Sequence, residues 1–466
     1  MSAAVKAIAA KNFTAVKLSL RVFKRVTLMD NSVTAGGEPD AHLPGQSAAR
    51  MGEQSVSKPK RVPLLAPRDK LAMLTVFVLA AAGVVALQLL RPGAGAATTT
   101  SSDAPLVAPP SDITQFRGIC LQVQSADDKA PFGTFIKEIA ATGANTICMS
   151  VAAFQQNCGS SSIFVDSRKV PSDKRLKELF ALAHKQGLKV ILMPIVLLEN
   201  PRTDEWRGKI DPTKDKNTWD DWWQNYTNYI LQYADLAQES KVDMFMVGSE
   251  LVSVEPQTER WEKLIKQVRG RFKGMLSYSA NWDHFMAKQG GPKFWDKLDI
   301  VGMTTYYDLC GSKKPTLDVL LDTWKDRKKE VLDWQATVNR PILFTEAGWP
   351  NQETAAQYPW DYYRAMDKKD PQLQKRCFEA FFKTWADEPA VGGYLVWEWQ
   401  NYEGMDTSPE KDCGYCPKGK PAMEVITKYF RLPNGKAAPA TAPAGRVTSS
   451  PEPIDEPDVA AGQDEK

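Results

Sequence analysis

Two glutamates in the sequence directly follow apolar segments, where a charged side chain needs a particular purpose. Glu250 ends the segment MFMVGSE and Glu346 ends the segment PILFTE. A pair of carboxyl groups across a cleft cleaves a glycosidic bond when one gives a proton to the leaving oxygen and the other stabilises or attacks the electron-poor sugar carbon. Different surroundings separate their proton affinities, which leaves one acid and one anion near neutral pH. A lone strand-end glutamate is more simply explained by an ion pair, so the hypothesis depends on having both.

Aromatic residues concentrate in the same part of the chain, since all 14 tryptophans lie between Trp206 and Trp399. Sugar rings present apolar C–H faces to aromatic planes and hydroxyl groups to polar side chains, so an aromatic residue with a polar tip serves both needs. The candidates for holding a sugar come at the ends of other apolar segments: Asn281, Trp282, Tyr306 and Trp397. Tryptophans inside helical stretches, such as Trp324, are more simply core residues.

The elements that must position these residues alternate along the chain. Eight apolar segments predict strands, at 117–124, 145–151, 188–194, 244–250, 275–279, 300–305, 341–346 and 393–397. Helical patterns fill most of the gaps, at 132–142, 173–186, 219–240, 259–271, 317–338, 371–385 and 422–430, with only a weak one at 294–297. Eight strands alternating with helices over residues 115–432 are typical of a (β/α)8 TIM barrel.

Such a barrel gathers the carboxyl ends of its strands at one rim, where active sites lie. The strands that end at Glu250 and Glu346 are the fourth and seventh, so their ends can face each other across the mouth. A doubly wound open sheet is the alternative, but no glycine-rich fingerprint opens any of the early helices. The absence of G-x-G-x-x-G and P-loop patterns also excludes dinucleotide and P-loop nucleotide chemistry.

The composition excludes further classes of protein. The net charge is only +3, from 59 basic and 56 acidic residues, so a dedicated nucleic-acid binder is not expected. Of the three histidines, His42, His184 and His284, no two are close in sequence, so we expect no zinc site. The predicted chemistry needs neither a metal nor an organic cofactor, and no segment indicates an obligate protein partner.

Residues 71–90, LAMLTVFVLAAAGVVALQLL, contain no charged side chain. At about 1.5 Å rise per residue, such a helix matches a hydrocarbon core of roughly 30 Å, so the segment predicts a transmembrane helix in a lipid bilayer. Residues 1–70 carry twelve Lys and Arg against five Asp and Glu, which places the N-terminus in the cytoplasm and the barrel outside it. Secretion after signal cleavage near Ala94-Gly95-Ala96 is the alternative, although seventy preceding residues are too many for an ordinary signal.

The other segments predict no fold of their own. Residues 1–70 hold Gly, Pro and Ser clusters without sustained periodicity, residues 91–114 are a flexible linker rich in Pro, Ala, Thr and Ser, and residues 433–466 form a low-complexity tail with an acidic end. Compositions of this kind are typical of disordered chain.

Six motifs in order along the predicted barrel resemble glycoside hydrolase family 113. They are VPSDKRLKELFALAHKQGLKVILMP at 170–194, the triplet Trp206-Arg207-Gly208, VGSEL at 247–251, YSANWD at 278–283, LFTEAGW at 343–349 and DCGYCPKGKPA at 412–422. The resemblance implies a retaining endo-β-1,4-mannanase that acts on a polysaccharide or oligosaccharide. It also implies that Trp206 and Arg207 contact the substrate.

The resemblance carries roles over to four residues. Glu250 matches the acid/base and Glu346 the nucleophile, and the two carboxyl groups of a retaining enzyme stand about 5–5.5 Å apart. Tyr306 matches the tyrosine that hydrogen-bonds the nucleophile, and Trp397 matches the tryptophan beneath the sugar at the −1 subsite.

One departure concerns the residue after Pro194. The family commonly has a polar residue there, whereas this sequence has Ile195, so Glu199 or Asn200 would have to supply polar contacts from the loop. Two other functions stay open at this stage: a non-catalytic barrel that binds glycan at the cell surface, and a transglycosylase that remodels envelope polymers.

The seven cysteines leave at least one thiol without a disulfide partner. Cys120 and Cys148 fall within predicted strands and are expected to be buried and inert. A disulfide between Cys158 and Cys310 is one possible pairing. The Cys413-x-x-Cys416 motif stands alone in a predicted loop without a helix start, so a local disulfide is favoured there over a redox or zinc site.

Overall fold

The computed structural model describes residues 113–311, 314–361, 368–400, 408–433 and 436–437. The predicted transmembrane helix at 71–90, the cytoplasmic segment 1–70, and most of the predicted linker and tail lie outside these residues. Within the described ranges no helix is long and apolar enough to cross a membrane.

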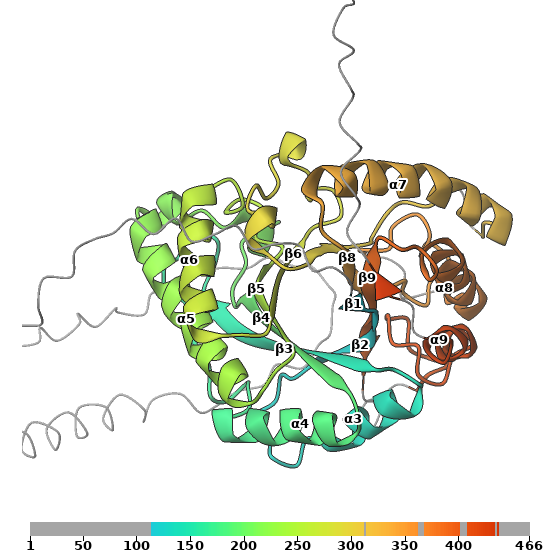
Figure 1. Ribbon diagram of the computed structural model, residues 1–466, viewed down its shortest axis with the longest axis horizontal. Helices are drawn as coiled ribbons and strands as arrows, with labels where there is room; N and C mark the ends of the chain where they lie inside the picture. Colours follow the sequence, from blue (N-terminus) through green and yellow to red (C-terminus); the bar gives the residue numbers. More distant parts are fainter. Residues whose placement is uncertain (1–112, 312–313, 362–367, 401–407, 434–435, 438–466) are drawn as a thin grey trace, which may run out of the picture. The chain divides into compact units, whose positions relative to one another are not determined.

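Eight parallel strands close into a barrel, which confirms the predicted fold class and excludes the open sheet. They follow one another around the ring in chain order: β2 (Phe116–Gln122), β3 (Thr146–Gln155), β4 (Lys189–Leu198), β5 (Met244–Ser249), β6 (Met275–Ala280), β7 (Val301–Thr304), β8 (Ile342–Ala347) and β9 (Val391–Trp399). Figure 1 looks along the barrel and shows the helices outside the ring of strands.

In the described part an α-helix follows every barrel strand except β6. These helices are α3 (Phe132–Ala141), α4 (Asp173–Lys185), α5 (Trp219–Glu239), α6 (Thr258–Arg271), α7 (Leu317–Val338), α8 (Pro371–Trp385) and α9 (Ala422–Phe430). Two 3-10 turns, η3 (Ala287–Gln289) and η4 (Trp295–Lys297), replace the missing helix, at the point where the sequence pattern is weak. Two more, η1 (Arg207–Lys209) and η2 (Pro212–Asp215), lie between β4 and α5.

Helix α5 shows why these segments fold against the barrel. Its aromatic residues Trp222, Tyr226, Tyr229 and Tyr233 recur every three or four positions, so they share one buried face. The hydroxyl groups of Tyr226 and Tyr229 donate to the carbonyl oxygens of Val247 and Val151 at 2.8 and 3.1 Å. The buried hydroxyl groups of these tyrosines thereby have hydrogen-bond partners on the strands of the barrel.

Strand β4 extends four residues past its predicted end at 194, through a proline. Beyond Leu192 it pairs with β3 alone, since its ladder to β5 contains only Ile191 and Leu192. Proline is tolerated where one side of a strand has no partner to receive its missing N–H. The extension carries Ile195 and Leu197 up to the rim.

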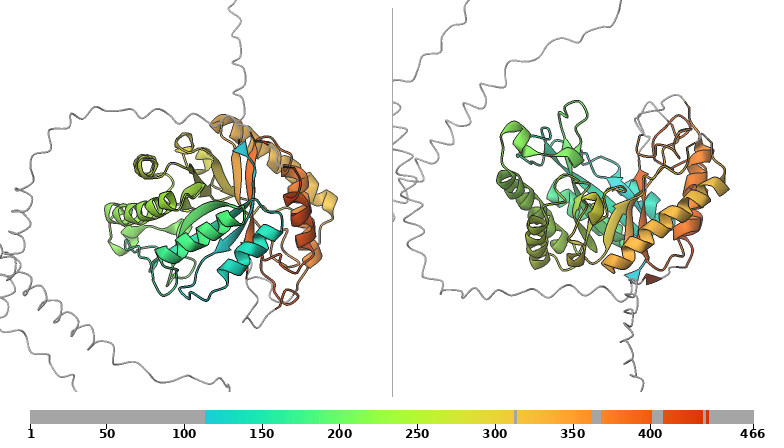
Figure 2. Two further views of the ribbon diagram at one scale, coloured as in Figure 1. Left: turned by 60° about the horizontal axis from the view of Figure 1, so that its bottom comes forward. Right: turned by 90° about the horizontal axis from the view of Figure 1, so that it is seen from above.

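A small additional sheet lies at the amino end of the barrel. Strand β1 (Ile113–Thr114) pairs antiparallel with β10 (Lys436–Ala437), which lie in the segments predicted as linker and tail. The guanidinium of Arg117 donates to the carbonyl oxygens of Leu432 and Pro433, at 2.5 and 2.9 Å, and so holds the chain that leads from α9 to β10. Figure 2 shows both short strands together at one end of the barrel.

Candidate active site

A cavity of about 940 Å³ lies at the carboxyl ends of the strands. All eight residues predicted to bind or cleave substrate contribute to its lining: Trp206, Arg207, Glu250, Asn281, Trp282, Tyr306, Glu346 and Trp397. They come from the ends of five strands and from the η1 turn, so only the closed barrel brings them together. Their individual roles remain predictions.

Glu250 is the first residue after β5, and its backbone is left-handed, with φ of +50°. A positive φ is uncommon for a residue other than glycine and costs about 1–3 kcal/mol. Two hydrogen bonds hold this conformation. The backbone N–H of Glu250 donates to the carbonyl oxygen of Ser279 at 2.8 Å, and the backbone N–H of Leu251 donates to the Tyr278 hydroxyl at 2.9 Å. This turn directs the carboxyl group into the mouth.

A second carboxyl group supports this turn from behind. The hydroxyl of Tyr278 donates to Glu255 at 2.8 Å, and Glu255 is fully buried. Burial raises the pKa of Glu255 to about 8, against the opposing effect of the Tyr278 hydrogen bond. Glu255 therefore holds its proton at neutral pH and adds no full negative charge behind Glu250.

Arg207 forms an ion pair with Glu250 inside the cavity, with its Nη2 atom 2.5 Å from the carboxylate. The pair is largely buried, since the two side chains are 20% and 10% exposed. The neighbouring Trp206 folds back over Gly208, where an added Cβ would lie 2.3–2.7 Å from ring carbons. A larger residue there would displace the ring from this position, which gives the Trp206-Arg207-Gly208 triplet a steric reason.

Glu346 lies within β8 and is 3% exposed. The Tyr306 hydroxyl donates to its Oε2 atom at 2.7 Å. Its Oε1 atom is buried and makes no hydrogen bond to any described residue. One oxygen of Glu346 is thus held by a donor while the other is available to a reacting atom.

Burial, and after it the negative charge of Glu250, raises the pKa of Glu346 to about 8. Arg207 and the Tyr306 hydroxyl act in the opposite direction. The negative charge of Glu250 opposes the ionisation of Glu346 in this buried site, so near neutral pH Glu346 favours its protonated form.

Aromatic rings form another side of the cavity. Trp282 stacks on Trp360 with ring centroids 5.5 Å apart and an interplanar angle of 18°, and its other contact is an edge-to-face packing on Tyr307 at 5.3 Å. The Trp282 amide donates to Thr304 at 3.0 Å, which fixes the loop after β6 to β7. Asn281 donates to Asp283 at 2.7 Å.

The prediction that Glu199 or Asn200 supplies polar contacts to the cavity is wrong. Glu199 pairs with Lys169 at 2.6 Å and accepts a hydrogen bond from Gln156 at 2.8 Å, and Asn200 donates to the same glutamine. Both lie outside the lining, because the long β3–β4 ladder carries them past the rim. Ile195 and Leu197 make this part of the cavity apolar.

Sequence reasoning missed several lining residues, among them Gln122, Trp360, Glu398, Asp412 and Tyr415. A signal was present for Glu398, because it interrupts the apolar strand end as Glu250 and Glu346 do. Trp360 gave none, since it lies in a long loop without a regular pattern.

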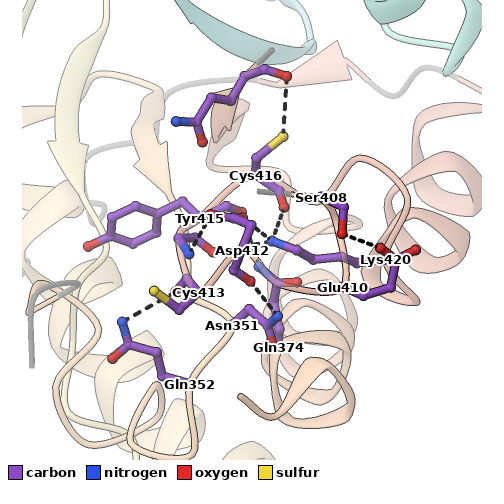
Figure 3. Close-up of polar contacts among 12 residues, drawn as sticks. Asn351, Gln352, Gln374, Ser408, Glu410, Asp412, Cys413, Tyr415, Cys416 and Lys420 are labelled. Atoms are coloured by element: carbon purple, nitrogen blue, oxygen red, sulfur yellow. Dashed lines mark hydrogen bonds and ion pairs between the residues drawn. The ribbon is translucent and has the colours of Figure 1, made fainter. Parts of the chain in front are cut away.

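Residues 408–421, which follow β9, enter the cavity with Asp412 and Tyr415. The Nζ atom of Lys420 lies 2.5 Å from Asp412 and donates to the Cys416 carbonyl at 2.6 Å. Figure 3 shows these side chains meeting inside the loop. Asn351 donates to the Asp412 carbonyl at 2.7 Å, which joins this loop to the one after β8.

The seven cysteines form no disulfide with one another. The prediction of a local Cys413–Cys416 disulfide is therefore wrong, and the possible Cys158–Cys310 pairing is not formed. The Sγ atom of Cys158 is 3.4 Å from the Trp206 carbonyl oxygen. Cys310 follows β7 and lies near Cys377, where it helps to raise the pKa of the Cys377 thiol. The Cys416 thiol is directed at the Gln400 carbonyl, at 3.8 Å. Cys120 and Cys148 are buried neighbours on adjacent strands, as expected.

Replacement of Lys420 by alanine is expected to lower the free energy of unfolding by about 3–5 kcal/mol, because it removes the cation from a buried ion pair. The side chains of Lys420 and Asp412 are only 2% and 13% exposed. Lys418 is the matched control: its pair with Glu138 is about 30% exposed on each side, so Lys418→Ala should cost less than about 1 kcal/mol. Equal losses in denaturant unfolding would contradict this account of the loop.

A closed (β/α)8 barrel with two buried glutamates and exposed tryptophans at its carboxyl rim has the architecture of a glycoside hydrolase. The model of Glycoside Hydrolase Family 113 matches residues 127–420, and the chain belongs to this family of enzymes. Comparison with curated proteins gave no significant match.

Solved structures of family members are similar along their whole length. The complex structure of a GH113 β-1,4-mannanase is 27% identical in sequence, with a TM-score of 0.60, and the match covers 69% of this chain and 100% of the other. The GH113 β-mannanase AaManA from Alicyclobacillus acidocaldarius, in complex with ManMIm, is also 27% identical, with a TM-score of 0.59 over 68% of this chain and 97% of the other.

Proposed function

We propose that the protein is a retaining β-1,4-mannanase that cleaves its polymer by double displacement at Glu250 and Glu346. The observation that carries the proposal is the placement of both carboxyl groups in one buried pocket, with Tyr306 bound to one and Arg207 to the other. Mannan as the substrate is supported by the solved structures, which are of β-1,4-mannanases.

In the first step Oε1 of Glu346 attacks the anomeric carbon, while the protonated Glu250 gives its proton to the departing glycosidic oxygen. The C–O bond to the leaving sugar breaks as the bond to Glu346 forms, which gives a covalent glycosyl-enzyme intermediate. The Tyr306 hydroxyl keeps Oε2 of Glu346 in place and leaves the other oxygen toward the sugar.

In the second step Glu250, now a carboxylate, takes a proton from water. The resulting attack on the anomeric carbon breaks the bond to Glu346 and restores the stereochemistry of the substrate. An acceptor sugar in place of water gives transglycosylation by the same chemistry.

The first step needs a proton on Glu250 and a carboxylate at Glu346. Burial and the charge of Glu250 favour the protonated form of Glu346, so the proton must pass from Glu346 to Glu250 before the attack. We propose that a sugar hydroxyl group that engages Arg207 weakens its ion pair with Glu250 and so assists this transfer.

Exposed tryptophans support a polymeric substrate. Five large apolar side chains in the described part are exposed, and the two aromatic ones, Trp206 at 37% and Trp360 at 43%, both line the cavity. Exposed apolar rings at the rim of a cleft mark places where a ligand covers them. We propose that they hold sugar units beyond the reactive one, which favours cleavage within the polymer.

Replacement of Trp360 or Trp206 by alanine is expected to lower kcat/KM for manno-oligosaccharides of five or six units by a factor of about 10, which corresponds to about 1.4 kcal/mol. The same variants should change kcat/KM for a short activated aryl mannoside by less than about 3-fold, because that substrate does not reach the outer rings. Val319 is equally exposed but lies outside the cavity, so Val319→Ala is the control. Equal losses on both substrates would contradict outer binding sites.

The test of the proposed function is a panel of β-linked manno-, gluco- and xylo-oligosaccharides with the purified full-length protein. Release of shorter manno-oligosaccharides with retained anomeric configuration supports the proposal. Binding to mannan without any release of reducing sugar would support a glycan-binding barrel instead. Products longer than the substrate in the presence of an acceptor sugar would show transglycosylation.

We also propose that residues 71–90 anchor the protein in a membrane, with residues 1–70 in the cytoplasm and the barrel on the other side. The support is the uncharged twenty-residue segment and the excess of Lys and Arg before it. Protease added to intact cells should then degrade the barrel, and carbonate washing should leave the protein in the membrane. A mature N-terminus after Ala96 would show secretion instead.

A further inference from the structure

A third carboxyl group lines the cavity and has no part in the double displacement. Glu398 lies on β9, directly after Trp397, and β9 is the neighbour of β2 in the barrel. At the end of β2, Gln122 donates from its Nε2 atom to the Oε2 atom of Glu398 at 2.5 Å. Both side chains belong to the lining.

A second glutamine fixes the orientation of this pair. The Nε2 atom of Gln124 donates to Oε1 of Gln122 at 2.6 Å, so the amide oxygen of Gln122 is occupied and its nitrogen faces Glu398. An amide nitrogen has two N–H groups, and one of them is used by Glu398. The remaining N–H and the Oε1 atom of Glu398 present a donor and an acceptor side by side.

No cation neutralises Glu398 within the described part of the chain, where it forms no ion pair. Burial raises the pKa of Glu398 to about 7, while the Gln122 hydrogen bond lowers it and the charge of Asp412 raises it further. A half-buried carboxyl group with one side-chain donor and no cation has acceptor capacity left for a ligand hydroxyl group.

The wall at the end of β4 cannot recognise hydroxyl groups in this way. Ile195 and Leu197 are apolar, and the polar residues at the end of β4 are bound outside the cavity. On the β2–β9 side, by contrast, Gln122 and Glu398 place polar groups next to Trp397.

We infer that Gln122 and Glu398 bind adjacent hydroxyl groups of the sugar ring that lies against Trp397, and so select which neutral hexose is accepted. The inference rests on the proposed function, because it assigns the sugar-reading part of the same site. The described lining carries five carboxyl groups, those of Glu250, Asp283, Glu346, Glu398 and Asp412, and one guanidinium, that of Arg207. Lys420, behind the lining, neutralises Asp412, and the other carboxyl groups still outnumber Arg207. Repulsion by this excess of acidic groups disfavours uronic acids and leaves neutral sugars as the ligand class.

The experiment combines Glu398→Ala, Glu398→Gln and Gln122→Ala with mannosides that lack one hydroxyl group each. Glu398→Ala should lower kcat/KM for the complete sugar by a factor of about 10 to 100, the range of a charge-assisted hydrogen bond. For the one deoxy sugar that lacks the hydroxyl bound by Glu398, the variant and the original protein should give equal values. Losses that are the same for every deoxy sugar would show a merely structural role and overturn the inference.

The chain offers a matched control at the next strands. Gln156 and Glu199 form the same kind of pair at 2.8 Å, outside the cavity. Gln156→Ala and Glu199→Gln should leave the sugar preference unchanged, and a change of preference there as large as that of Glu398→Ala would contradict the assignment.

Calorimetric binding of the same sugars to Glu346→Gln protein separates this inference from the proposed function. If the original protein hydrolyses nothing but the Glu346→Gln protein binds selectively and loses this selectivity with Glu398→Ala, the mannanase proposal is refuted and the hydroxyl-binding pair is supported. If the original protein hydrolyses mannan but sugar binding does not depend on Glu398, the mannanase proposal is supported and the hydroxyl-binding pair is refuted. Absence of both hydrolysis and binding would overturn both.

Discussion

Replacement of Glu346 by alanine is expected to lower kcat on mannan by a factor of about 10⁴ or more, because it removes the group proposed to form the covalent intermediate. The loss should be equally large on an activated aryl mannoside, since attack on the anomeric carbon is needed whatever the leaving group. The test measures kcat on both substrates with the same preparation of the variant. The cavity left by the missing carboxyl group makes an external nucleophile effective, so azide should yield a glycosyl azide of inverted configuration.

Glu199 is the appropriate control for Glu346. It also follows an apolar strand, but it is held by Lys169 outside the cavity. Glu199→Ala should keep nearly full activity. Comparable turnover by Glu346→Ala and the original protein would remove the nucleophile from its proposed place.

Replacement of Glu250 by alanine is expected to act differently on the two substrates. On mannan, kcat should fall by a factor of about 10²–10⁴ or more, because neither the departing oxygen nor the attacking water has its proton-transfer partner. On an activated aryl mannoside the first step needs no acid, so the intermediate should form quickly and accumulate. Azide, which needs no base, should restore turnover with retained configuration.

The pH dependence provides a second measurement on the same variant. In the original protein, kcat/KM should fall as the pH rises through about 8, where Glu346 loses the proton that Glu250 must receive for the first step. Removal of Glu250 removes its negative charge, which lowers the pKa of Glu346 and leaves that carboxyl group ionised over a wider range. The decline at high pH should therefore disappear for the activated substrate. An unchanged profile would contradict this transfer of the proton.

The barrel was predictable because its signals are local. Apolar segments such as 244–250 and 341–346 predict strands from their own residues alone. The alternation of these strands with helices then predicts the topology of the barrel. The two glutamates were found for the same reason, since each stands out against its own strand.

The partners of these glutamates depend on contacts across the ring, which no local pattern contains. The positive φ of Glu250, its pairing with Arg207 and the Gln122–Glu398 pair exist only once the barrel has closed. The error at Glu199 has the same origin, because the length of the β3–β4 ladder decides whether a residue lies in the cavity or beyond it. The prediction of a Cys413–Cys416 disulfide failed because spacing along the chain does not measure the separation of sulfur atoms.

The β1–β10 pair has a consequence for how a large substrate reaches the enzyme. The chain joins and leaves the barrel at the amino end of its strands, while the pocket opens at the carboxyl end. A tether on the N-terminal side, as proposed, would therefore join the barrel at the end away from the pocket. Long, insoluble or cross-linked fibres could then reach the pocket without steric interference from the attachment point.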